Sequence, residues 1–97
     1  MGTYVWLLSY TDQGIRAVKD TVKRADAVKE RAKTYGVTVK ELLWTQGQYD
    51  AVAILEAPDE LAVTTLGLSI GALGNVRTQT LRAFSAADIK TAIDKMR

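Results

Sequence analysis

Segments of strand-type and helix-type periodicity alternate along all 97 residues, and their order limits the folds that the chain can adopt. Residues 3–11 are rich in aromatic and aliphatic side chains and predict a strand. Apolar residues then recur at steps of three and four up to Gly36, which predicts a helix with Asp12 as N-cap and Gly36 as C-terminal cap. Alternatively, residues 12–20 form a separate turn before the main helix.

The rest of the chain continues this alternation. It predicts a hairpin of two strands, at residues 37–45 and 49–56, and a second helix at residues 58–73. A fourth strand follows at residues 75–84, and the capping motif of Ser85 to Asp88 opens a short last helix. The second helix is apolar around most of its circumference, so we expect it to be buried on more than one side.

This order of elements predicts a single α+β domain over residues 1–97, with the ferredoxin-like βαββαβ(α) arrangement. In its four-stranded antiparallel sheet, the first strand lies between the third and fourth strands, and the second strand lies outside the third. Both long helices then cover one face of the sheet, and the other face is bare.

The hairpin predicts which side chains share a face. A two-residue turn produces three cross-strand pairs, Trp44 with Ala51, Leu42 with Ala53, and Lys40 with Leu55. We expect the helices to cover an aliphatic set, Val5, Leu7, Val39, Leu43, Val52 and Ile54. The bare face then carries Tyr4, Trp6, Leu8, Leu42, Trp44 and Leu55. Because a monomer seldom leaves such a patch in water, we predict a homo-oligomer that pairs through the open sheet face.

The chain contains no cysteine and no histidine, which removes several chemistries. Disulfides, thiolate nucleophiles, zinc–sulfur sites and the commonest general base are excluded. Catalysis would have to use Asp, Glu, Lys, Tyr or Arg side chains, or a bound cofactor. We therefore expect no transition-metal site and no cofactor.

The net charge of +2 is too small to imply a nucleic-acid partner. Residues 49–54 also lack the paired aromatic residues of RNA-recognition modules that share this topology. The longest weakly polar stretch, residues 61–76, is too short to span a bilayer, and the first residues lack the features of a signal peptide. We predict a cytoplasmic protein with no nucleic-acid and no membrane partner.

Polar and aromatic residues are expected to gather at one edge of the sheet, where the first two strands end and the last two begin. A cleft there could bind a small polar or aromatic ligand through Tyr10, Trp44, Tyr49, Asp50, Asn75 and Arg77. Each also has a structural alternative. Asp50 beside the hairpin turn is often a backbone hydrogen-bond acceptor, Arg77 could pair with it, and Trp44 and Tyr49 could be packing groups.

Several longer segments match one family. They are residues 11–15 (TDQGI), 44–52 (WTQGQYDAV), 56–59 (EAPD) and 74–84 (GNVRTQTLRAF), with Gly47, Tyr49 and Asp50 at characteristic positions. With these segments the chain resembles the GYD-domain family, small bacterial and archaeal proteins of largely unknown function. The resemblance implies a ferredoxin-like protomer of the dimeric α/β-barrel group, but it implies no activity, because that group includes oxygenases, haem-degrading enzymes and binding modules.

Three classes of function remain open. Our leading hypothesis is a non-catalytic, homo-oligomeric module that binds a small ligand or acts as an accessory protein. The alternatives are a small-molecule enzyme of the cofactor-free oxygenase type, working in an inter-sheet cavity with Tyr and Asp residues, and a structural or assembly protein. We assign no catalytic residue.

Overall fold

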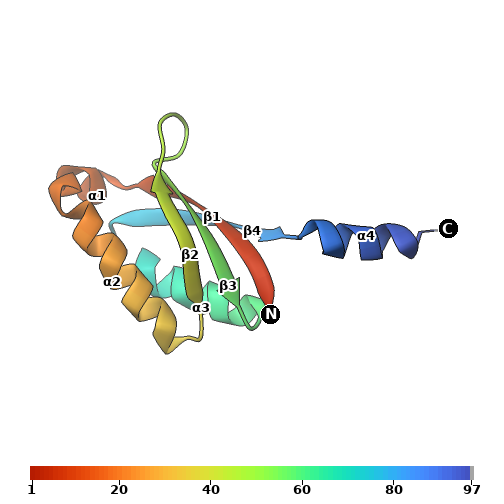
Figure 1. The fold of residues 1–97 in the computed structure, drawn as a ribbon. Helices are drawn as coiled ribbons and strands as arrows, with labels where there is room; N and C mark the ends of the chain where they lie inside the picture. Colours follow the sequence, from red (N-terminus) through yellow and green to blue (C-terminus); the bar gives the residue numbers. More distant parts are fainter. Residues whose placement is uncertain (97) are drawn as a thin grey trace.

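A four-stranded antiparallel sheet forms the centre of the fold in the computed structural model, which describes residues 1–96. Its strands are β1 (Gly2–Tyr10), β2 (Thr38–Trp44), β3 (Ala51–Ala57) and β4 (Val76–Ala83), in the spatial order β2-β3-β1-β4. The helical segments are α1 (Asp12–Arg16), the 3₁₀ turn η1 (Val18–Asp20), α2 (Thr21–Thr34), α3 (Glu60–Gly71) and α4 (Ala86–Asp94). The predicted α+β class and strand order are confirmed (Figure 1).

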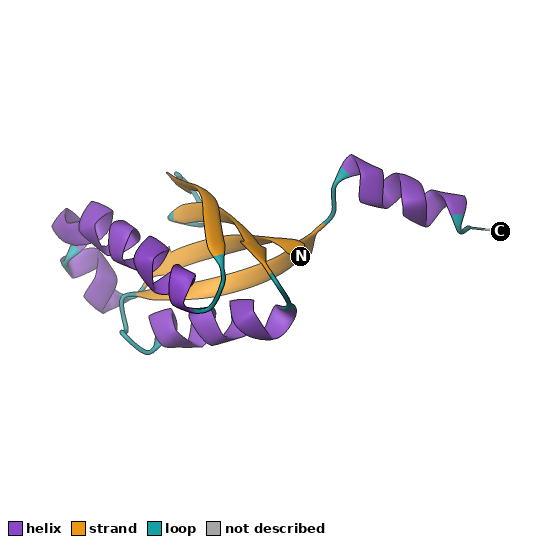
Figure 2. Cartoon of the chain, turned by 60° about the horizontal axis from the view of Figure 1, so that its bottom comes forward, coloured by secondary structure: helices purple, strands orange, loops and turns teal. Residues whose placement is uncertain are grey.

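Helices α2 and α3 cover the same face of the sheet, as predicted (Figure 2). The core lies between these two layers and combines Ala32 of α2 with three residues of α3, Val63, Leu66 and Ile70. Helix α4 continues beyond β4 and projects away from the body of the molecule in both views (Figures 1 and 2).

The assignment of the two sheet faces was wrong. Burial alternates along β1 from Gly2 to Ser9, and the buried residues are those of the aromatic set, Tyr4, Trp6 and Leu8. They pack under the helices together with Leu42 of β2 and Leu55 of β3. The face without helices carries most of the aliphatic set instead, Val5, Leu7, Leu43, Val52 and Ile54, together with Leu81. Val39 is the exception, since it packs under the helices as predicted. Alternation sorts residues into two sets but does not decide which set faces the helices. The rings fit inside because β3 contributes alanines there.

The predicted hairpin register is correct at one end and wrong at the other. Trp44 pairs with Ala51 and Leu42 with Ala53, but the partner of Leu55 is Val39 rather than Lys40. A β-bulge between Val39 and Glu41 shifts the register by one residue. As a result, Val39 and Leu42 both pack against the core under the helices.

The helices differ from expectation in two respects. Thr11, rather than Asp12, caps α1, since its Oγ1 accepts a hydrogen bond from the Gly14 amide at 3.0 Å. The alternative of a separate turn before the main helix is confirmed, because η1 separates α1 from α2. Helix α3 is buried on one side only, and its remaining leucines, together with the one that follows it, are exposed: Leu61, Leu68 and Leu73.

The predicted capping motif opens α4. The Ser85 hydroxyl accepts a hydrogen bond from the Asp88 amide, and the Asp88 carboxylate accepts one from the Ser85 amide, each at 3.1 Å. The backbone hydrogen bond from Ser85, and then the one with its side chain, lower the pKa of Asp88. Because the folded-state pKa is depressed, the cap contributes its stability above the ordinary carboxyl pKa and loses it as the pH falls through the depressed value.

Gly14 allows α1 to lie directly on the segment before β4. A Cβ atom at Gly14 would stand 1.9 Å from the carbonyl oxygen of Asn75, which is far inside van der Waals contact. That carbonyl also accepts a hydrogen bond from the Thr11 amide at 3.1 Å, so moving it would break the contact between the start of α1 and the segment before β4.

We predict that Gly14→Ala lowers the free energy of unfolding by at least about 2 kcal/mol, because a buried backbone contact must be displaced. The matched change Gly71→Ala should be neutral or stabilise by up to about 1 kcal/mol, because this helical glycine has no atom within 4 Å of the added methyl group. Urea denaturation of both variants measures the difference. Equal unfolding free energies of the two variants would contradict a close contact between Gly14 and the Asn75 carbonyl.

Candidate functional site

A cavity of about 290 Å³ lies between α2 and the sheet. Strands β1, β2 and β3 form one wall, and α2 forms the other. Ile70 of α3, the segment between α3 and β4, and Val76 at the start of β4 close one end. Its volume is close to the lower limit of pockets that bind small molecules.

Small side chains on both walls account for the cavity. On the sheet wall, β3 contributes Ala51 and Ala53 to the lining. On the helix wall, α2 contributes Ala25, Ala27 and Val28. The other lining residues range from Ser9 and Thr21 to large side chains such as Trp6 and Trp44. Because alanine side chains are too short to meet across the gap, space is left between two layers that are otherwise closely packed.

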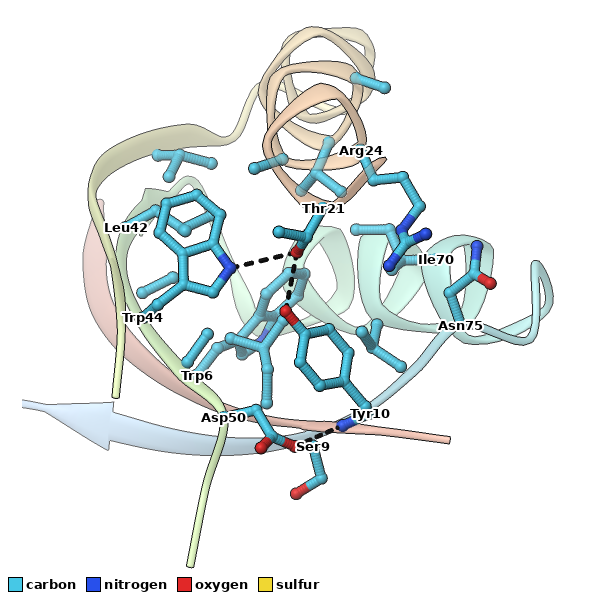
Figure 3. A pocket seen from close by; sticks show the side chains of 18 of the residues that line it. Trp6, Ser9, Tyr10, Thr21, Arg24, Leu42, Trp44, Asp50, Ile70 and Asn75 are labelled. Carbon is cyan, nitrogen blue, oxygen red and sulfur yellow. Dashed lines mark hydrogen bonds between the residues drawn. The ribbon is translucent and has the colours of Figure 1, made fainter. Parts of the chain in front are cut away.

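A hydrogen-bonded group of three side chains stands at the polar end of the cavity. The Thr21 hydroxyl accepts a hydrogen bond from Trp44 Nε1 at 3.1 Å and lies 2.8 Å from Tyr10 Oη (Figure 3). These contacts join α2 to the ends of β1 and β2. Trp44 and Tyr10 are therefore positioned by Thr21, a residue that sequence reasoning did not single out.

Asp50 holds the end of β1 against the start of β3. Its Oδ2 accepts a hydrogen bond from the Tyr10 amide at 2.7 Å, and its own amide donates to the Leu8 carbonyl at 2.8 Å. The carboxylate thus takes the place of a backbone carbonyl in the ladder. The expectation of a backbone hydrogen-bond acceptor is confirmed, and the carboxylate also lines the cavity.

Positive charge exceeds negative charge around the cavity, since Arg24, Arg31 and Asp50 are its charged lining residues. Arg24 donates hydrogen bonds to the carbonyls of Ala17 and Gly14, at 2.7 and 3.2 Å, and Arg31 donates to Ser69 Oγ at 2.8 Å. Within residues 1–96, neither guanidinium forms an ion pair. A neutral acceptor leaves the charge of an arginine uncompensated, so the lining favours an anionic group.

Four of the six predicted site residues line the cavity, Tyr10, Trp44, Asp50 and Asn75. Asn75 is held structurally, because its Oδ1 accepts a hydrogen bond from Gln13 Nε2 at 2.9 Å. Tyr49 lies elsewhere and donates a hydrogen bond from Oη to Gln79 Oε1 at 2.9 Å. Arg77 is exposed and stands opposite Ser9, on the face away from the helices, so it does not meet Asp50 as its suggested ion-pair partner.

Sequence reasoning missed the contribution of α2 to this site. Thr21, Arg24, Val28 and Arg31 follow one another at three- and four-residue steps and line the cavity together. That spacing is visible in the sequence and marks one helix face. The expectation of one continuous first helix hid it, because η1 changes the phase at which α2 begins.

Trp6 Nε1 is a buried donor with no hydrogen-bond partner among the described residues. The indole lies beside α3, with Cζ2 3.7 Å from the position that a Cβ on Gly67 would occupy. Since Nε1 is itself fully buried, it does not project into the open part of the cavity. An unpaired buried N–H costs roughly 1–3 kcal/mol, which the burial of the large ring offsets.

Within residues 1–96, no group of three or more Asp or Glu side chains is arranged to hold a metal ion. Over the same range, every helix is too short or too polar to cross a membrane.

The comparisons with known proteins agree with the fold and with the family motifs. The sequence pattern of the GYD domain matches residues 4–93. A Thermus thermophilus protein named "Glutamine synthetase and cystathionine beta-lyase binding protein" is 32% identical over 90 residues, which span 92% of this chain and 95% of the relative. The crystal structure of TTHA0845, also from Thermus thermophilus, has a TM-score of 0.57 and 27% sequence identity, covering 89% of this chain and 96% of that one. The chain belongs to the GYD-domain family.

Proposed function

We propose that this chain is a non-catalytic binding module that holds a small ligand in the cavity between α2 and the sheet. The observation that carries the proposal is a cavity of about 290 Å³ whose walls are mostly apolar and whose charged lining residues are two arginines and one aspartate. Concave apolar sites with a few polar groups at one end are typical of small-molecule pockets.

The proposed ligand has an apolar body and one anionic group. Trp6, Leu8 and Leu42 would contact the body, and the guanidinium of Arg24 would pair with the anion. Arg24 lines the cavity, where a charge-assisted contact is less screened than on the open surface. Tyr10 would border the polar end of the bound molecule.

The lining supports binding rather than catalysis. Asp50 contributes the single carboxylate, and that group already accepts the Tyr10 amide as part of the sheet. The Tyr10 amide engages Oδ2, so a catalytic role would have to use Oδ1, and within residues 1–96 the lining offers no second carboxylate to act as the paired acid or base.

We further propose that the protein forms a homo-oligomer through the open sheet face, in the manner of a dimeric α/β barrel. Six aliphatic side chains share that face without cover from a helix, and they are Val5, Leu7, Leu43, Val52, Ile54 and Leu81. Burying them against a second sheet removes apolar surface from water.

An accessory role, with other proteins as partners, is a second candidate. It is favoured by the Thermus thermophilus relative, whose name describes a protein that binds two enzymes. Ligand binding and an accessory role are compatible, since a module of this kind could report a small molecule to a protein partner.

We predict that 4-phenylbutyrate binds with a dissociation constant of roughly 10 µM to 1 mM, and that its neutral analogue 4-phenylbutanol binds at least about fivefold more weakly. Arg24→Gln should remove this preference, whereas Arg16→Gln, an exposed change outside the cavity lining, should preserve it. Isothermal titration of both probes against the three proteins measures the effect.

Filling the cavity provides the second half of this test. Ala53→Leu places a larger side chain on the sheet wall and should abolish binding of both probes while the protein stays folded. Binding that is unchanged by Ala53→Leu would show that the probes occupy another place, and the proposed function would then fail.

Asp50→Asn separates the structural role of this residue from a role in binding. The change keeps an oxygen that can accept the Tyr10 amide but removes the charge, so we expect a loss of roughly 1–3 kcal/mol in unfolding free energy. Affinity for the anionic probe should rise slightly or stay constant, because a negative charge leaves the cavity lining. A large loss of affinity with unchanged stability would instead assign the carboxylate to the ligand.

A further inference from the structure

Helix α4 is amphipathic and every one of its residues, Ala86–Asp94, is exposed. Its apolar side chains lie three and four residues apart and form one stripe, which Met96 extends beyond the last turn. Phe84, just before the N-cap, is exposed as well, and the Arg82 guanidinium lies 4.5 Å from its ring centroid. The exposed fractions are 58% for Phe84, 47% for Ile89, 57% for Ile93 and 74% for Met96. Charged residues occupy other sides of the helix. Such a stripe is typical of a helix that packs against another surface.

A helix of nine residues is not stable alone in water, even with a good N-terminal cap. The capping box at Ser85 sets where α4 begins but does not supply the packing energy of a tertiary contact. The body of the same chain does not supply it either, because α4 leads away from the sheet and extends the molecule to 52 Å in its longest dimension (Figures 1 and 2).

Surface area favours a second copy of this chain as the occupant. Leu43, Ile54 and Leu81, the most exposed aliphatic residues of the open sheet face, present on the order of 250 Å² of apolar surface, and the half-buried Val5, Leu7 and Val52 add less than that. One side of a standard stable interface buries roughly 800 Å², of which on the order of 500 Å² is apolar in homodimers. Phe84 and the stripe of α4 present on the order of 450 Å² more, so the sheet face and α4 together reach an apolar area that the sheet face alone does not.

We propose that α4 crosses to a second copy of the chain and packs its apolar stripe against that copy, completing the interface that the open sheet face begins. The proposal rests on the homo-oligomer proposed above. In a two-fold pair each copy gives one α4 and receives one, so both stripes are buried by the same contact.

The test compares two double variants of the full chain that add the same charge at the same spacing. Ile89→Asp with Ile93→Asp interrupts the stripe, and Ala87→Asp with Thr91→Asp places two aspartates on the opposite side of α4. Sedimentation from about 1 to 100 µM should show an oligomer for the unchanged chain and the opposite-side variant. The stripe variant should dissociate at least about tenfold more readily.

A third variant, Ile54→Lys, alters the open sheet face alone and separates the two proposals. Should Ile54→Lys dissociate the oligomer while the stripe variant does not, the sheet interface stands and the role of α4 is overturned. A monomer for the unchanged chain at about 100 µM would overturn both. Amide hydrogen exchange measures directly whether α4 is covered. The amides of residues 89–94 should be protected from exchange in the oligomer and unprotected in the stripe variant. Equal exchange in the two proteins would also overturn the proposal.

Discussion

Burial of the Trp6 indole between the sheet and the helices determines which side chains form the core and which stay on the open sheet face. Trp6 is 1% exposed, and it shares its face with Tyr4 and Leu8 because side chains alternate along a strand. Once this row is inside, the alternate residues of the same strand, Val5 and Leu7, must lie on the open face. The packing of one row therefore sets both the contents of the core and the chemistry of the surface that is left uncovered.

The cavity follows from the same packing. A tryptophan in the central strand needs small neighbours, and β3 supplies Ala53 directly opposite it. Between Ala53 and α2 the side chains do not fill the space, so a volume of about 290 Å³ remains. The network of Tyr10, Thr21 and Trp44 then holds α2 at a fixed distance from the strand ends. The cavity is thus framed by side chains that also stabilise the fold.

The order of elements could be predicted from the sequence because changes of periodicity and turn residues are local signals. The pairing of Trp44 with Ala51 was predictable for the same reason, since the hairpin turn fixes it. Which set of β1 residues lies under the helices could not be predicted, because both sets are apolar. The outcome depends on the space that Ala53 and the helices leave for large side chains. The bulge beside Lys40 has no strong sequence signal. Arg24 was missed because its position depends on the phase of α2, which the preceding 3₁₀ turn resets.

In the function proposed above, a small ligand occupies the space between α2 and the sheet rather than the open sheet face. Nuclear Overhauser effects between bound 4-phenylbutyrate and assigned methyl groups distinguish the two locations directly. We expect contacts to the methyl groups of Ala53, Val28 and Leu42, which line the cavity. Contacts confined to Val52 and Ile54, which point to the opposite face of the same sheet, would contradict the account.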